Sequence, residues 1–155
     1  MKAKKGGGWL DALGKAGLEV QSASDALQVK GWLDSGNYAL NWAMSGRLLR
    51  GYPLGHTIEI FGDPSTGKSF LIARAIAMAQ KAGGVALLDD TEGAYNLEHS
   101  VVLGVNVTKL AYRNSRTVKD HLDTAVAFIS AYRSLGLTVP AVLACDSLAQ
   151  LSTVH

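Results

Sequence analysis

The sequence predicts an α/β fold built on a mainly parallel sheet with helices on both of its faces. From residue 56 onward, short apolar runs typical of strands alternate with longer stretches of helical periodicity. Strands separated by helices require crossover connections, which place the strands parallel to one another. With 155 residues, 48% of them hydrophobic and 18% charged, the chain is long enough for one domain of this kind.

Two regions are expected along the chain. Residues 1–30 are expected to form an N-terminal tail and a short helix, because the weak helical pattern there is interrupted by Gly14 and Gly17. Residues 31–155 are expected to form the domain itself. A helix is predicted over 38–49, where apolar residues recur at helical spacing.

The alternating pattern of the domain defines its expected strands and helices. The strands are expected at 56–61, 85–90, 107–112 and 141–146, and the helices at 68–83, about 94–103 and about 117–134. The last of these helices is amphipathic, with an apolar stripe of Val118, Leu122, Val126, Ile129 and Tyr132. Ligands of parallel sheets bind beyond the carboxyl ends of the strands, so polar residues at those ends are the candidate site.

Composition and charge exclude several classes of protein. The net charge of +2 gives no argument for a nucleic-acid or membrane partner, and a single cysteine excludes an internal disulfide framework. No apolar run is long enough to span a bilayer, and the basic N-terminus lacks the apolar segment of a signal peptide. A cytoplasmic protein without a membrane partner is predicted.

Residues 62–69, GDPSTGKS, follow the glycine-loop pattern G-x-x-x-x-G-K-[ST] between a predicted strand and a predicted helix. The two glycines permit a tight turn, so that backbone N–H groups and the helix N-terminus wrap the β- and γ-phosphates of a nucleotide. The lysine adds a positive charge and the last serine is a Mg²⁺ ligand. A plain glycine-rich turn with a solvated lysine is the alternative. The predicted nucleotide-binding residues are Gly62, Asp63, Pro64, Ser65, Thr66, Gly67, Lys68 and Ser69.

Carboxylates follow two of the predicted strands. Asp89, Asp90 and Glu92 lie at the end of the strand 85–90, and three charges of one sign are too costly to bury together in an apolar core. Glu92, just past the strand end, is placed to activate a water in line with the γ-phosphate; a solvated acidic turn is the alternative. Asp146 ends the strand 141–146 and is predicted to hold Mg²⁺ opposite the loop serine.

Cys145 is expected to pack in the core, because no His or Asn pattern supports a thiol nucleophile. Of the histidines only His99 is singled out, and no spacing of histidines and cysteine suggests zinc.

With these segments together, the chain resembles the RecA-type recombinase ATPases, particularly phage-encoded members. The resemblance begins near residue 31, includes the loop, and is carried further by LLDDTEGA (87–94), LGVN (103–106) and ACDSLAQL (144–151). It implies a RecA-like P-loop ATPase core. The glycine loop, the D-T-E-G segment and the final D-S pair together are far more specific for this family than the loop alone.

The resemblance also implies roles for individual residues. Glu92 matches the glutamate that activates water and, with Lys68, is the predicted catalytic pair; Asp146 matches the metal-linked position. Counting back from LGVN, Asn96 and His99 fall on positions that line the adenine pocket, where the family usually carries an aspartate and a stacking tyrosine. The expected ligands are ATP and Mg²⁺.

The resemblance implies partners as well. In this family ATP lies between neighbouring subunits and drives filament formation on single-stranded DNA, in homologous recombination and repair. The family continues past its magnesium strand into two DNA-binding loops and further strands, one of which lies between the loop strand and the magnesium strand. Because the sequence ends at His155, a core incomplete at its C-terminus is expected, from a fragment, a truncated reading frame or half of a split protein.

Other functions fit the same residues. A hexameric helicase or a clock-type ATPase uses the same core with different downstream segments. A small-molecule phosphotransferase uses the same loop, with substrate-binding arginines in a lid. A fourth hypothesis is a non-catalytic core that binds nucleotide weakly or assembles only with full-length partners.

Overall fold

A computed structural model describes residues 7–153 of the chain. The chain divides into two compact units, Met1–Lys30 and Gly31–His155. The first unit contains α1 (Gly7–Lys15) and α2 (Ala23–Ala26). Residues 1–6 of the predicted tail, and residues 154–155, lie outside the described residues.

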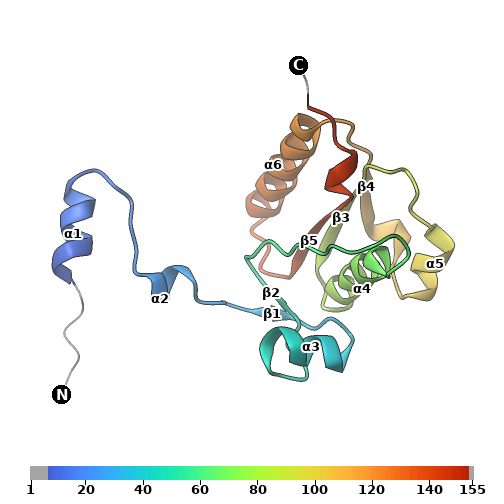
Figure 1. The fold of residues 1–155 in the computed structure, drawn as a ribbon, viewed down its shortest axis with the longest axis horizontal. Coiled ribbons are helices and arrows are strands. Elements are labelled where there is room, and N and C mark those ends of the chain that lie inside the picture. Colours follow the sequence, from blue (N-terminus) through green and yellow to red (C-terminus); the bar gives the residue numbers. More distant parts are fainter. Residues whose placement is uncertain (1–6, 154–155) are drawn as a thin grey trace. The chain divides into compact units, whose positions relative to one another are not determined.

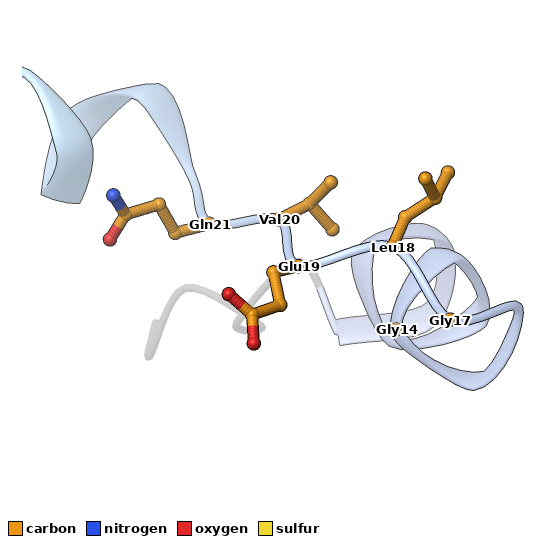
Figure 2. Close-up of a pocket in the computed structure, with 6 residues that line it drawn as sticks. All are labelled: Gly14, Gly17, Leu18, Glu19, Val20 and Gln21. Atoms are coloured by element: carbon orange, nitrogen blue, oxygen red, sulfur yellow. The ribbon is translucent and has the colours of Figure 1, made fainter.

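The helical pattern of the N-terminal unit is divided between these two short helices. α1 ends before Gly17, whose φ of 85° is a left-handed conformation that favours glycine. Figure 2 shows the linking segment, where an open hollow is lined by Gly14, Gly17, Leu18, Glu19, Val20 and Gln21. The side chains project in different directions from an extended backbone, and none belongs to the predicted site, so this hollow is not a candidate site.

The second unit is organised around a parallel sheet of three strands in the order β4-β3-β5. These are β3 (Val85–Asp90), β4 (Leu110–Arg113) and β5 (Ala141–Asp146). α5 (Leu97–Val102) lies in the connection from β3 to β4, and α6 (Val118–Ser134) lies in the connection from β4 to β5. α4 and α6 pack on opposite faces of the strands (Figure 1). The predicted parallel α/β fold is confirmed.

α4 (Lys68–Lys81) is the central helix of this unit and begins at the residue that the sequence predicts. On one side it buries Ala73, Ile76 and Ala77 against Ala86, Leu88 and Val105. On another side Ala79 packs with Leu33 and Tyr52. The small alanine side chains let α4 approach both the parallel sheet and the β1–β2 segment closely. The buried apolar area fixes the position of the helix that follows the glycine loop.

A second, antiparallel pair of short strands precedes the glycine loop. β1 (Trp32–Leu33) pairs with β2 (Tyr52–Pro53), and α3 (Tyr38–Ser45) lies between them in the chain. α3 ends earlier than predicted, because Gly46 takes a left-handed φ of 67° and donates its N–H to the Trp42 carbonyl at 2.8 Å.

Asn41 of α3 is fully buried and holds this segment together. Its Oδ1 accepts from the Ser35 N–H at 3.0 Å and from the Ser35 hydroxyl at 2.7 Å. Its Nδ2 donates to Asp34 Oδ1 and to the Leu48 carbonyl, both at 2.7 Å. The bond from Asn41 also lowers the pKa of Asp34. Both acceptor positions of Oδ1 and both donor positions of Nδ2 in the Asn41 side chain are thus used.

Asn41→Ala is expected to lower the free energy of unfolding by about 2–4 kcal/mol, because it leaves several buried polar groups without partners. Urea unfolding followed by circular dichroism measures the change. Asn37→Ala is the matched control: Asn37 caps the same helix from an exposed position by accepting from the Leu40 N–H, and its loss costs about 1 kcal/mol. Equal losses in the two variants contradict the prediction.

The strand predicted at 56–61 is wrong, since the structure has no strand there. Phe61 is 87% exposed and Ile58 is 39% exposed. A strand exists only when a neighbour pairs with its backbone, and within the described residues no segment pairs with 56–61. The glycine loop therefore follows an irregular segment.

Two other predicted elements have different bounds. The predicted strand 107–112 begins as a 3-10 turn, Val107–Lys109, and only then enters β4. The helix expected near 94–103 is shortened to α5, because Asn96 caps its start and Gly104 follows its end with a φ of 94°.

α6 forms where the sequence predicts it, but of the predicted apolar stripe only Tyr132 lies on the less exposed side of the helix. Leu122 is 57% exposed and Val126 is 64% exposed. The less exposed stripe is instead His121, Ala125, Phe128 and Tyr132. His121 Nδ1 lies 2.8 Å from Asp89 Oδ2, and the Tyr132 hydroxyl donates to the Val139 carbonyl at 2.7 Å. These two bonds fix the rotation of α6, which a helical hydropathy pattern does not record.

Candidate functional site

The glycine loop curls around the amino group of its own lysine. Lys68 Nζ donates to the Gly62 carbonyl at 2.9 Å and to the Asp63 carbonyl at 2.8 Å. The Thr66 hydroxyl also donates to the Asp63 carbonyl, at 2.8 Å. The loop is therefore a compact turn with the only positive side-chain charge of residues 62–69 at its centre.

The backbone of the loop leads directly into the N-terminus of α4. Gly67 has a left-handed φ of 97° and caps the helix without any side-chain hydrogen bond. Ser65 also has a positive φ, 63°, which is uncommon for a residue other than glycine. Uncapped N–H groups at the start of α4 and the turned backbone before it are the groups that bind phosphate in loops of this type.

The loop meets the end of β5 through one hydrogen bond. Ser69 Oγ donates to Asp146 Oδ2 at 2.7 Å, although the two residues are 77 positions apart in the chain. A hydroxyl and a carboxylate oxygen are hard donors, which suit Mg²⁺. The donor set of this pair fits the ion that the sequence predicts there.

Glu92 lies at the same edge of the sheet and is exposed. Its Oε1 accepts from the hydroxyl of Ser147, the residue after Asp146, at 2.9 Å. Thr91 reinforces the link, since its N–H donates to the Asp146 carbonyl at 3.0 Å and its hydroxyl to the Ser147 carbonyl at 2.6 Å. The structure thus brings together the turn that carries Glu92 and the residues that end β5.

Asp90 holds the turn that carries Glu92. Its side-chain oxygens accept from the backbone N–H groups of Gly93, Ala94 and Tyr95 at 2.9, 3.3 and 3.0 Å. Oδ2 also accepts from the Tyr112 hydroxyl of β4 at 2.9 Å. Asp90 is 3% exposed, so its oxygens are engaged inside the protein, and it is a positioning residue for the turn.

Asn96 caps the start of α5, and His99 lies on that helix. Asn96 Oδ1 accepts from the His99 N–H at 2.8 Å and so caps the helix. Both side chains are exposed, and among the described residues no hydrogen bond joins either of them to residues 62–69. Their role in an adenine pocket stays a prediction.

Sequence reasoning missed a second polar cluster on the other face of the sheet. Asp89 is completely buried and accepts from the Ser115 N–H at 2.8 Å, besides its contact with His121. Burial alone would raise the pKa of Asp89, but the bonds from His121 and Ser115 outweigh it and lower the pKa. Burial, with the charges of Asp89 and Asp146, raises the pKa of the nearby Cys145 thiol to about 11.

Comparison with known proteins identifies the family of this chain. A model of the RecA N-terminal domain matches residues 11–152. The chain belongs to the RecA family. It is 37% identical to Protein RecA of Borreliella burgdorferi (strain ZS7) over 141 residues, and 34% identical to Protein RecA of Bacteroides thetaiotaomicron over 136 residues.

These RecA alignments include most of the chain but a minor part of each relative. They span 91% and 88% of this chain, and 36% and 38% of the two relatives. Over 78 residues the identity to Protein RecA of Porphyromonas gingivalis (strain ATCC 33277) rises to 45%. In the part of the chain that the structure describes, no helix is long and apolar enough to cross a membrane.

Proposed function

We propose that this RecA-family chain binds ATP at residues 62–69 and hydrolyses it, with Ser69 and Asp146 holding Mg²⁺ and Glu92 acting as general base. The observation that carries the proposal is the 2.7 Å contact between Ser69 and Asp146. It joins the glycine loop to a strand end, and the Glu92 turn is bonded to that same strand end.

Each residue has a distinct task in this proposal. The loop N–H groups and the start of α4 bind the β- and γ-phosphates, and Lys68 exchanges its two loop carbonyls for phosphate oxygens. When bound, Mg²⁺ neutralises charge that develops on the phosphates. Glu92 accepts a proton from the attacking water, and Ser147 holds its carboxylate in place.

Calorimetry of the 155-residue chain with ATP tests the binding step. We expect micromolar affinity with Mg²⁺ present and at least about tenfold weaker binding with Mg²⁺ removed by a chelator, since Ser69 and Asp146 would hold the ion and it would neutralise phosphate charge. Equal affinity in both conditions contradicts the assignment of Ser69 and Asp146. No binding by a folded chain contradicts the nucleotide proposal and favours the non-catalytic alternative.

We further propose that the activity serves homologous recombination and repair on single-stranded DNA, through a homo-oligomer or filament. Family membership supports this proposal, and so do relatives that bear the name Protein RecA. The chain spans just over a third of those relatives, 36% and 38%. Assignment to the phage-encoded branch, and a cytoplasmic location, stay predictions.

The affinity for single-stranded DNA is expected to fall steeply and linearly on a logarithmic plot against salt concentration. Phosphate contacts release condensed counterions, with a slope near −0.7 for each phosphate neutralised on a single strand. Fluorescence anisotropy of a labelled oligonucleotide, with Mg²⁺-ATP present, measures the slope. A protein that binds with no dependence on salt contradicts recognition through the DNA backbone.

A further inference from the structure

The cluster of Asp89, His121 and Cys145 lies apart from the nucleotide site, on the opposite face of the sheet. In the parallel register Asp89 is paired with Cys145, and Asp90 with Asp146. Successive residues of a strand point to opposite faces, and paired residues point to the same face. Asp90 and Asp146 therefore share the face of α4, whereas Asp89 and Cys145 share the face of α6, which contributes His121.

The three side chains offer one donor atom each within a small volume. A carboxylate oxygen, an imidazole nitrogen and the cysteine sulfur all lie within 4.8 Å of one another. Neighbouring ligands of a tetrahedral zinc ion lie roughly 3–4 Å apart, so the cluster has nearly the required size. The His121 ring and Asp89 are closer, 2.8 Å, and an ion between them requires a movement of about 1 Å.

The chemistry of these donors selects the kind of cation. Thiolate and imidazole are ligands of zinc and related thiophilic ions, whereas Mg²⁺ and Ca²⁺ take oxygen ligands. We propose that Asp89, His121 and Cys145 bind a thiophilic divalent cation of the zinc class, with release of the thiol proton to solvent. This inference does not rest on the proposed ATPase function.

The surroundings of the cluster support a bound ion. Ser115 is 1% exposed, and its hydroxyl, beside Asp89, has no hydrogen-bond partner within the described part of the chain. Its backbone N–H holds the second oxygen of Asp89 at 2.8 Å, as outer partners of metal-binding carboxylates do. The His121 side chain is 15% exposed, so one edge of its ring reaches solvent.

The alternative is that the Asp89–His121 pair binds no ion and only holds β3 and α6 together. A buried ion pair is seldom more stabilising than well-packed apolar residues of the same size. A purely structural role for this pair also leaves the sulfur of Cys145 and the buried hydroxyl of Ser115 without a partner among the described residues. A cation uses the sulfur, the imidazole and the carboxylate together, and its water can use the hydroxyl.

Co²⁺ titration of the full chain tests the proposal, because Co²⁺ occupies zinc sites and reports its ligands by absorption. Cys145 is the single cysteine of the chain, so a sulfur-to-cobalt charge-transfer band comes from this site alone. We expect one equivalent of Co²⁺ to produce the band, stoichiometric Zn²⁺ to abolish it, and millimolar Mg²⁺ to leave it unchanged. A folded wild-type chain that gives no such band overturns the proposal.

Variants separate this site from other binding. Cys145→Ser is expected to lose the band, and His121→Gln, which removes a proposed ligand, to weaken Co²⁺ binding by at least about 10-fold. His56→Gln, at an exposed histidine outside both the cluster and the nucleotide site, is expected to keep wild-type affinity. Circular dichroism establishes that each variant is folded. Equal Co²⁺ affinity in His121→Gln and wild type overturns the assignment of the imidazole.

Discussion

Lys68→Ala is expected to weaken Mg²⁺-ATP binding by about 100-fold or more, which corresponds to about 2.7 kcal/mol. The amine lies inside the turn, 2.9 and 2.8 Å from two loop carbonyls, so it is already positioned beside the backbone that receives the phosphates. Hydrogen bonds between ionised partners are roughly twice as strong as neutral ones, and alanine removes them together with the charge. Calorimetry with ATP and Mg²⁺ measures the loss.

Lys81→Ala is the matched control, because Lys81 is an exposed lysine at the other end of the same helix. Its ATP affinity is expected to equal that of the wild type. Alanine is the best helix former, so neither variant should lose α4. If folded Lys68→Ala binds ATP as well as Lys81→Ala does, residues 62–69 are a glycine-rich turn and not a phosphate-binding loop.

The central elements could be predicted because their signals are local. Residues 85–88 and 141–145 are apolar runs followed by carboxylates, as expected for strands of a parallel sheet, and the structure places β3 and β5 over 85–90 and 141–146. α4 begins at Lys68, directly after Gly67, whose left-handed φ of 97° lies outside the helical conformation. Local pattern and tertiary environment agree for these elements.

The predictions that were wrong concern features that depend on residues distant in the sequence. Residues 56–61 have strand-like composition, but a strand needs a paired neighbour, and β5 pairs with β3 alone among the described strands. The rotation of α6 depends on His121 meeting Asp89, 32 positions away, which no hydropathy pattern contains. Similarly, the buried role of Asn41 follows from its four hydrogen bonds and not from its residue type.

The candidate site shows the same division. The loop could be found from its spacing, and Glu92 and Asp146 from their positions after apolar strands. The bond between Ser69 and Asp146, and the task of Asp90 in holding the Glu92 turn, appear only when strand register is known. The cluster of Asp89, His121 and Cys145 has no spacing motif, since each residue comes from a different element.

Glu92→Gln is expected to keep Mg²⁺-ATP affinity within about threefold and to lower the rate of hydrolysis by about 10²- to 10⁴-fold, the usual contribution of a general base. The amide has the size of the carboxylate, and its oxygen can still accept from the Ser147 hydroxyl, now 2.9 Å from Glu92. It cannot accept the proton of the attacking water. Phosphate release, with saturating Mg²⁺-ATP and single-stranded DNA, measures the change.

Glu98→Gln, in the exposed first turn of α5, is the control for losing one negative charge near this edge and is expected to hydrolyse ATP at the wild-type rate. Turnover that survives Glu92→Gln means that the 91–93 turn is a solvated acidic turn. A wild-type chain that binds ATP but releases no phosphate contradicts hydrolysis by this chain while leaving the binding site intact. Binding and chemistry are therefore tested separately. Lys68 contacts the phosphates both in the bound ground state and in the transition state, whereas Glu92 acts only on the water that attacks them.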